Sequence, residues 1–449
     1  PKAGQLVVFA LQQMLAILAA TIAVPLIIGN GLTPAAAMFG AGVGTIVYIL
    51  FTKRKSPVFL GSSFAFLGSM AAAFAGGVSM QLGMLGLIIG ALLAGLVYVV
   101  IAIVVKFVGV GWLNKLMPAV VIGPTVAIIG LSLAGNAIGD LLKGDVTKQV
   151  TDYVVSTDSG TPEIIETVSN VPVGSSYVAL VCGLITLAVV MLCSAYGKKT
   201  LKLIPFIIGI LAGYAAAAIF TVIGNICDID ALKIVDLSVF SSYMLTDGST
   251  SLKTFVSLPD FSFVSGLEGL KEFDFSYFAT IFVAYVPVAL VVFAEHVADH
   301  KNLSSIIDHD LLEEPGLTRT LLGDGVGSIA GALFGGCPNT TYGESVACVA
   351  ITGNASVITI FAAAIGCILF SFITPLVAFV DSIPACVMGG VCIALYGFIA
   401  VSGLKMIQDV NLDDNRNLFV VSVILIAGIG GLTLTFGDIT LTEVAAALI

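Results

Sequence analysis

The sequence predicts an all-α polytopic membrane protein with fourteen transmembrane segments arranged as two inverted seven-helix repeats. Composition is the first reason, because 58% of the 449 residues are hydrophobic and only 10% are charged, whereas soluble domains average about 25% charged residues. Long apolar runs such as 82–105, 177–192 and 357–380 are the second reason, since a spanning helix needs roughly 20 apolar residues. A resemblance between the two halves of the chain is the third.

The apolar segments follow one another along the whole chain. We expect membrane segments at 5–29, 33–52, 57–76, 82–106, 117–139, 175–196, 203–226, 276–299, 316–335, 338–353, 355–380, 384–402, 415–432 and 437–449. Two of them, 57–76 and 338–353, open with proline, small polar residues and an aromatic residue before they become helical. Irregular backbone at membrane depth survives only when it is buried in protein or lines a wet cavity, so these two segments mark a candidate site.

Two pairs of motifs indicate an internal duplication. "GSSFAF" at 61–66 shares its small, hydroxyl and aromatic positions with "NTTYGE" at 339–344, and "PAVVIG" at Pro118 matches "PACVMG" at Pro384. Chance similarity of Gly- and Ala-rich membrane sequence is the alternative explanation. Because each copy holds seven segments, the second copy is inverted in the membrane. Such repeats are typical of secondary transporters, which bind substrate where corresponding helices are interrupted.

Charged connections predict the orientation of the chain. Basic residues gather in three short connections: Lys53, Arg54 and Lys55; Lys106 and Lys115; and Lys198, Lys199 and Lys202. The acidic residues that give a net charge of −10 concentrate in 140–166 and 228–274. Short loops rich in Lys and Arg stay on the cytoplasmic side, so the two long acidic loops face out. The first of these loops contains a strand-like stretch, "TKQVTDYVVS".

Ionisable residues at membrane depth are costly, at about 3 kcal/mol or more each, and therefore point to function. Glu295 and Asp299 are four residues apart and share a helix face. Two such carboxylates tend to hold one proton between them, which suits proton coupling. His296 and His300 occupy a neighbouring face. In an alternative interpretation, Asp299 and His300 only end the helix at the inner surface beside Lys301.

Glu344 follows the second interrupted stretch. A helix that starts near Gly343 aims free N–H groups and its positive dipole end into the protein, and the mirrored helix start near Phe64 does the same. A carboxylate beside unpaired N–H groups offers acceptors and donors together. This combination suits a ligand whose edges alternate N–H and C=O groups. Alternatively, Glu344 only caps its own helix.

Other polar residues in the predicted spans allow two interpretations each. Asp324, in "LLGDGVGS", is either a proton-coupling residue or a structural link between helices. Gln12 and Gln13, in the first span, either face the cavity or hydrogen-bond to a neighbouring helix.

Signatures of soluble chemistry are missing from the sequence. It contains no phosphate-binding loop, no nucleophile elbow and no basic run interleaved with aromatic residues. Its eight cysteines show neither metal-type nor disulfide-type spacing. We therefore expect no enzyme, no metal or organic cofactor and no nucleic-acid partner.

Several blocks together resemble the nucleobase–cation symporter 2 family, also called nucleobase–ascorbate transporters, and within it the bacterial uracil permeases. These blocks are "GSSFAFLGS", "FAEHVADH", "LLEEPGLTRTLLGDG", "GGCPNTTYGES" and "PACVMGG". The resemblance runs over essentially the whole chain. Its most specific parts are "AEH" and "PNTTYGE".

The resemblance implies a fold and a set of site residues. Short strands would pair with half-helices in segments 3 and 10, a core domain would comprise 1–110 and 276–382, and a gate domain would comprise 111–275 and 383–449. Glu295 would bind the uracil ring and Glu344 would support the site. The remaining substrate-binding positions would be the backbones of Phe64 and Gly343 near the carbonyls, Tyr342 in the pocket, Ala20 against the ring and Tyr396 facing the site from the gate.

Three positions depart from the uracil permease pattern. Gln13 stands where these permeases usually have His, Ser345 where they have Asn, and Asp299 where the well-studied type has His. An acid at position 299, together with Asp324, also occurs in xanthine-type relatives. Those relatives, however, carry Gln where this chain has Glu344, so the balance favours uracil.

The sequence therefore predicts a bacterial inner-membrane importer that couples uracil uptake to protons by alternating access. Proton coupling is expected to involve Glu295, Asp299, His296 and Asp324, with the proton gradient in place of a cofactor. The expected partners are uracil, protons and membrane lipid, and a homodimer through the gate domain is one arrangement that the family suggests. Alternatives are a xanthine or purine–proton symporter of the same fold, an anion transporter on the related seven-plus-seven fold, or a receptor that does not transport.

Overall fold

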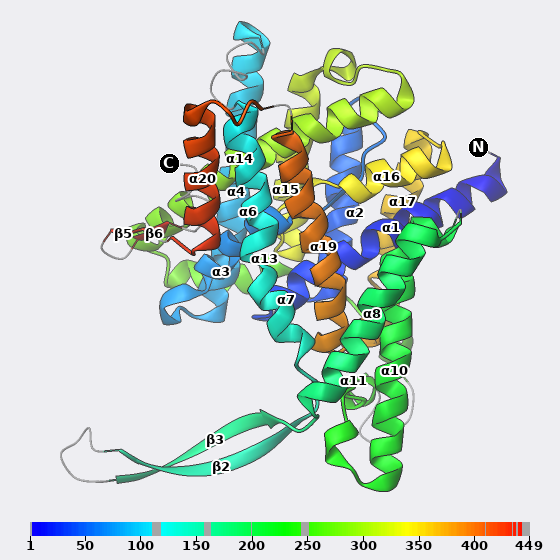
Figure 1. The fold of residues 1–449 in the computed structure, drawn as a ribbon, viewed down its shortest axis with the longest axis vertical. Coiled ribbons are helices and arrows are strands. Elements are labelled where there is room, and N and C mark those ends of the chain that lie inside the picture. Colours follow the sequence, from blue (N-terminus) through cyan, green and yellow to red (C-terminus); the bar gives the residue numbers. More distant parts are fainter. Residues whose placement is uncertain are drawn as a thin grey trace.

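The computed structural model describes residues 2–109, 118–156, 163–198, 200–243, 251–408, 410–432, 434–436 and 439–441. Its body is a bundle of helices from which one long β-hairpin projects (Figure 1). Within these residues, eight helical segments are long and apolar enough to cross a membrane. They are α1 (Ala3–Ile28), α2 (Pro34–Phe51), α4 (Met80–Val108), α6 with α7 (Ala119–Ser132 and Ala134–Leu141), α8 (Ser176–Tyr196), α10 (Pro205–Cys227), α14 (Phe275–Ile307) and α19 (Ala385–Met406).

The other membrane segments are shorter or interrupted. They contain β1 (Leu60–Ser62), η1 (Phe64–Phe66), α3 (Leu67–Ala73), α15 (Leu317–Gly335), β4 (Asn339–Thr341), α16 (Gly343–Thr352), α17 (Val357–Phe370), α18 (Thr374–Asp381) and α20 (Asn415–Ile429). The predicted span 355–380 is thus two helices. Its break precedes Pro375, which lies in the first turn of α18, where the missing N–H group of proline costs nothing.

Corresponding elements of the two halves confirm the inverted seven-helix repeat. Short strands occur in segments 3 and 10, as predicted, and β1 pairs with β4 in antiparallel fashion. Pro118 and Pro384 are the N-caps of α6 and α19, with nearly equal dihedral angles (φ −70°, ψ 157° and φ −69°, ψ 150°). These two helices pack against each other.

The long acidic loops contain the strand predicted from "TKQVTDYVVS". It is β2 (Thr147–Ser156), which pairs with β3 (Glu163–Pro172) to form the hairpin that projects from the lower end of the molecule in Figure 1. The remaining short elements lie mostly in connections: η2 (Ala75–Gly77), α9 (Thr200–Leu203), η3 (Asp230–Leu232), α11 (Ser238–Ser242), α12 (Leu252–Phe255), α13 (Ser262–Glu268), η4 (Gly269–Lys271) and η5 (Leu312–Gly316).

The last predicted segment, 437–449, is wrong as a helix where the structure describes it. Residues 439–441 form β6 (Ile439–Leu441), which pairs with β5 (Leu434–Phe436). The stretch "TLTFGDITLT" explains this, because β-branched and aromatic residues flank a Gly-Asp pair suited to a two-residue hairpin turn. Positions 437–438 and 442–449 lie outside the described residues.

Close glycine contacts join α2 to α15. Gly40 and Gly44 are four residues apart on α2, and Gly327 and Gly331 are four apart on α15. A Cβ atom at Gly44 would lie 2.7 Å from the Gly327 carbonyl oxygen, and one at Gly327 would lie 2.8 Å from the Gly44 oxygen. Small residues at this spacing let helix backbones approach closely in a membrane, so this contact fixes α15 beside α2.

We predict that Gly327→Val destabilises the protein, because the new side chain collides with the α2 backbone at Gly44 as well as with the Leu60 side chain. Overpacking of this kind costs about 1–3 kcal/mol. Gly397→Val is the matched control, since a Cβ atom there meets nothing within 4 Å. Thermal unfolding of the purified proteins in detergent checks this. Equal unfolding midpoints for the two variants would contradict the helix contact.

Candidate functional site

The crossing of β1 and β4 is the structural centre of the candidate site. Leu60 pairs with Thr341 and Ser62 with Asn339, and the Ser63 N–H donates to the Pro338 carbonyl at 2.8 Å. Both strands are buried. The pairing satisfies part of the backbone of two interrupted segments that lipid could not satisfy. The Thr45 hydroxyl of α2 adds to it, because it accepts from the Leu60 N–H at 2.9 Å and donates to the Leu60 carbonyl at 3.1 Å.

Each strand leads directly into a helix start. β1 is followed by η1 at Phe64, and β4 by α16 at Gly343. The side chains of the two N-cap residues, Ser63 and Tyr342, cap neither start. The first N–H groups of both helices are therefore available to a ligand, together with the positive end of each helix dipole.

Three acids gather beside this crossing. Glu295 lies on α14, which packs against η1, β4 and α16, and Asp299 and Glu344 lie within Coulombic range of it. Glu295 and Glu344 are both half-buried. Asp299 accepts a hydrogen bond from the Thr341 hydroxyl at 2.7 Å, which joins α14 to β4. The structure thus brings the predicted acids together.

The predicted pocket residues occupy the same region. The Tyr342 hydroxyl donates to the Ser62 carbonyl oxygen at 2.7 Å and so links the end of β4 to β1. Ala20 is buried in α1, a helix that contacts β1 and α16. Tyr396 of α19 meets Phe64 edge-on, with ring centroids 5.9 Å apart.

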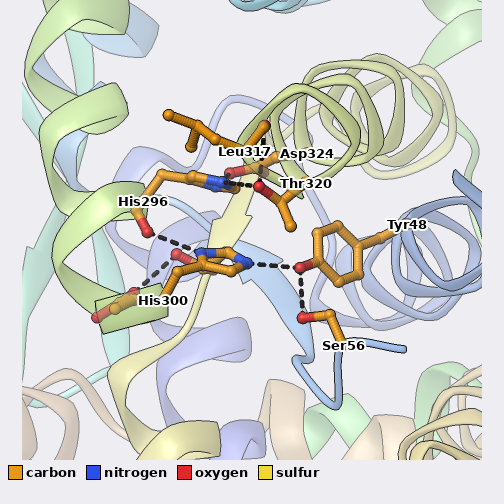
Figure 2. Close-up of polar contacts among 9 residues, drawn as sticks. Tyr48, Ser56, His296, His300, Leu317, Thr320 and Asp324 are labelled. Atoms are coloured by element: carbon orange, nitrogen blue, oxygen red, sulfur yellow. Dashed lines mark hydrogen bonds and ion pairs between the residues drawn. The ribbon is translucent and has the colours of Figure 1, made fainter. Parts of the chain in front are cut away.

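His296 and Asp324 form a separate buried pair. The His296 Nδ1 atom lies 2.6 Å from Asp324 Oδ2, and its Nε2 atom lies 3.0 Å from the Thr320 hydroxyl. Both residues of the pair are fully buried. Figure 2 shows this pair above a second group formed by His300, Tyr48 and Ser56.

The interpretation that α14 ends at His300 is wrong. The helix continues to Ile307, and His300 is fully buried. Its Nε2 atom lies 2.6 Å from the Tyr48 hydroxyl. This hydrogen bond gives the buried imidazole a polar partner inside the protein. Local sequence does not single out Tyr48, which lies near the end of an ordinary apolar segment.

Gln13 and Ser345 meet behind the crossing. The Gln13 amide donates to the Ser345 hydroxyl oxygen, which also accepts from the Phe59 N–H at 3.2 Å. Gln13 therefore links α1 to α16, which confirms the interpretation that it hydrogen-bonds to a neighbouring helix. The Oε1 atom of Gln12 is buried without a partner among the described residues, and so are the hydroxyls of Ser62, Ser63 and Thr340.

A cavity of about 1120 Å³ is lined by Phe64, at the start of η1, and by residues that include Asn30, Asn136 and Asp274. Asn136 and Asp274 lie beside or within the long acidic segments that the charge pattern assigns to the outside. Within the described part of the chain, no group of three or more His, Cys, Asp or Glu residues is placed to hold a metal ion.

Comparison with known proteins matches this chain to one family. The model of the permease family Xan_ur_permease covers residues 4–436. A uracil permease of Bacillus caldolyticus is 36% identical over 440 residues, which are 98% of this chain and 88% of the relative. Uracil permeases of Bacillus subtilis (strain 168) and Escherichia coli (strain K12) are 35% and 32% identical, over 94% and 100% of this chain and 85% and 90% of the relatives.

Solved structures share the fold at low sequence identity. The transmembrane domain of the cyanobacterial bicarbonate transporter BicA aligns with a TM-score of 0.61 and 14% identity, over 94% of this chain and 95% of that chain. SLC26A9 aligns with a TM-score of 0.59 and 12% identity, over 98% of this chain and 63% of that one. With a family model over nearly its whole length and relatives above 30% identity, the chain belongs to this permease family and is a multi-pass transporter of the bacterial cell membrane.

Proposed function

We propose that this permease imports uracil together with protons. The observation that carries the proposal is the crossing of β1 and β4, which places two uncapped helix starts beside the half-buried carboxylates Glu295 and Glu344. Relatives that cover nearly the whole chain are named uracil permeases, which supports the choice of substrate.

Uracil presents the chemistry that this arrangement can bind. Its ring carries two N–H donors and two carbonyl acceptors in alternation. In our proposal, the Glu295 carboxylate accepts from the ring N–H groups, and the Phe64 and Gly343 N–H groups donate to the carbonyls. Glu344 completes the network, while Tyr342, Ala20 and Tyr396 enclose the ring. Hydrogen bonds to charged groups contribute about 1.5–3 kcal/mol each, so two or three would give selective binding.

Proton coupling is assigned to the carboxylates around α14. Glu295 and Asp299 lie one turn apart and within Coulombic range of Glu344, so a proton shared among them offsets their repulsion. His296 and Asp324 form the second buried pair of this system. Each proton that enters contributes about 2.3 kcal/mol per 100 mV of membrane potential, which concentrates uracil roughly fifty-fold.

Alternating access would move a core domain (1–110 and 276–382) against a gate domain (111–275 and 383–449). The packing is compatible with this division, because α15 packs on α2 and α4, whereas α6 packs on α19 and α20. The Phe64–Tyr396 contact would separate as the two domains move. A homodimer through the gate domain stays a prediction.

Two other classes of substrate, xanthine and anions, are alternatives to uracil. The acid at Asp299 leaves a xanthine–proton symporter as the alternative within the fold, and competition of xanthine against labelled uracil separates the two. BicA shares the fold and is named a bicarbonate transporter. A site that binds an anion at the helix starts would need a positively charged side chain there. This site holds carboxylates instead, which argues against an anion as the substrate.

We predict that Glu295→Gln abolishes concentrative uracil uptake, because the amide loses one acceptor and cannot take up a proton. The expected loss in uracil affinity is about 10- to 100-fold, as for a charged hydrogen bond of about 1.5–3 kcal/mol. Proteoliposome uptake of radiolabelled uracil under an imposed proton gradient measures it. Glu313→Gln, at an exposed position, is the control. Wild-type accumulation by Glu295→Gln would overturn the mechanism.

A second prediction concerns the cavity as the outer entrance. Ala71 is exposed and lines it, so we expect Ala71→Cys to react with a membrane-impermeant thiol reagent added outside cells and to lose uracil uptake. Cys193 and Cys227, which are not buried, are first replaced by serine. Lys405→Cys, at the opposite end of the bundle, serves as the unreactive control. If the external reagent labelled Lys405→Cys but not Ala71→Cys, the chain would have the opposite orientation in the membrane, and the cavity would open to the cytoplasm.

A further inference from the structure

A chain of three buried side chains leads from α14 to the basic connection after α2. His300 Nε2 lies 2.6 Å from the Tyr48 hydroxyl, which lies 2.7 Å from the Ser56 hydroxyl. All three side chains are fully buried. Ser56 follows Lys55, which is half exposed and pairs with the exposed Glu314. Figure 2 shows the Tyr48 hydroxyl between His300 and Ser56, in contact with both.

The direction of each hydrogen bond follows from the chemistry of the partners. His300 Nδ1 lies 2.7 Å from the His296 carbonyl oxygen, and a carbonyl can only accept, so Nδ1 carries a hydrogen. In neutral His300 the Nε2 atom is therefore the acceptor. The Tyr48 hydroxyl then donates to Nε2, and the Ser56 hydroxyl donates to the Tyr48 oxygen.

Protonation of His300 reverses this chain without moving a heavy atom. A proton that reaches the Ser56 oxygen allows the Ser56 hydroxyl proton to pass to Tyr48 and the Tyr48 proton to pass to His300 Nε2. His300 becomes a cation, both hydroxyls stay neutral, and every bond is kept with donor and acceptor exchanged. Because Nδ1 is already occupied, His300 is the end of the chain, and its proton returns the same way.

We propose that His300, Tyr48 and Ser56 form an inner proton path through which His300 exchanges a proton with the cytoplasmic side during transport. This rests on the proposed proton-coupled function. His300 directly follows Asp299, and Asp299 and Asp324 lie within Coulombic range of Tyr48. A positive His300 favours the ionised form of these acids, and so promotes release of the coupled proton inside. His300 is a positioning residue, since it does not contact the proposed uracil site.

The titratable groups around the path come from each helix that packs on it. They are Tyr48 on α2, His296 and Asp299 on α14, and Asp324 on α15. The His296 ring stacks on the His300 ring, with centroids 4.0 Å apart. The His296 nitrogens already have the partners Asp324 and Thr320, so Tyr48 is the side-chain route to His300 in the described part of the chain.

The test compares two transport modes in proteoliposomes. Net uptake of labelled uracil driven by a proton gradient requires proton release inside in every cycle, whereas exchange of labelled for unlabelled uracil does not. We expect Ser56→Ala and Tyr48→Phe to lower the rate of net uptake about tenfold and to leave exchange unchanged. A tenfold lower rate corresponds to an activation free energy that is about 1.4 kcal/mol higher.

Two matched variants serve as controls. Ser56→Thr keeps the hydroxyl and should restore net uptake. Tyr98→Phe removes another buried tyrosine hydroxyl, one that has no partner among the described residues, and should leave both modes unchanged. Net uptake and exchange that fall equally in Ser56→Ala would show a structural role, and wild-type net uptake in both path variants would place the proton path elsewhere. Absence of proton-driven uracil uptake by the wild type would instead refute the proposed function.

Discussion

The backbone pairing of β1 with β4 at membrane depth is the interaction on which the rest of the structure depends. Two chain segments leave the helical conformation there, and lipid offers nothing to their N–H and C=O groups. Each strand supplies some of the hydrogen bonds that the other lacks, and the Thr45 hydroxyl supplies those of Leu60. The pairing also holds two helix starts, at Phe64 and Gly343, on either side of one small region, and this makes donors available where α14 presents its acids.

Much of this could be predicted from local sequence. Proline, small hydroxyl residues and an aromatic residue in place of a continuous apolar run marked both interrupted segments, and their similarity indicated the inverted repeat. Glu295, Asp299 and Glu344 stood out because carboxylates are rare in apolar segments, and the structure brings them together. The core and gate boundaries and the residue roles at the site stay predictions.

Other features depend on partners that are distant in sequence. His300 looked like a helix end, because Lys301 follows it; its burial depends on Tyr48, 252 residues earlier. The contacts of Ser345 with Gln13 and Phe59 likewise cross between helices. The strands at Leu434–Phe436 and Ile439–Leu441 are apolar enough to resemble a membrane helix, but their β-branched residues favour the extended conformation.

A structure determined with uracil bound would show whether the two helix starts and Glu295 form the binding site. We predict that the ring lies between the starts of η1 and α16, with its N–H groups on Glu295 and its carbonyls on the Phe64 and Gly343 N–H groups. Glu344 would lie beside it. Density for uracil only in the outer cavity, or a ring that contacts neither Glu295 nor the two helix starts, would contradict the account.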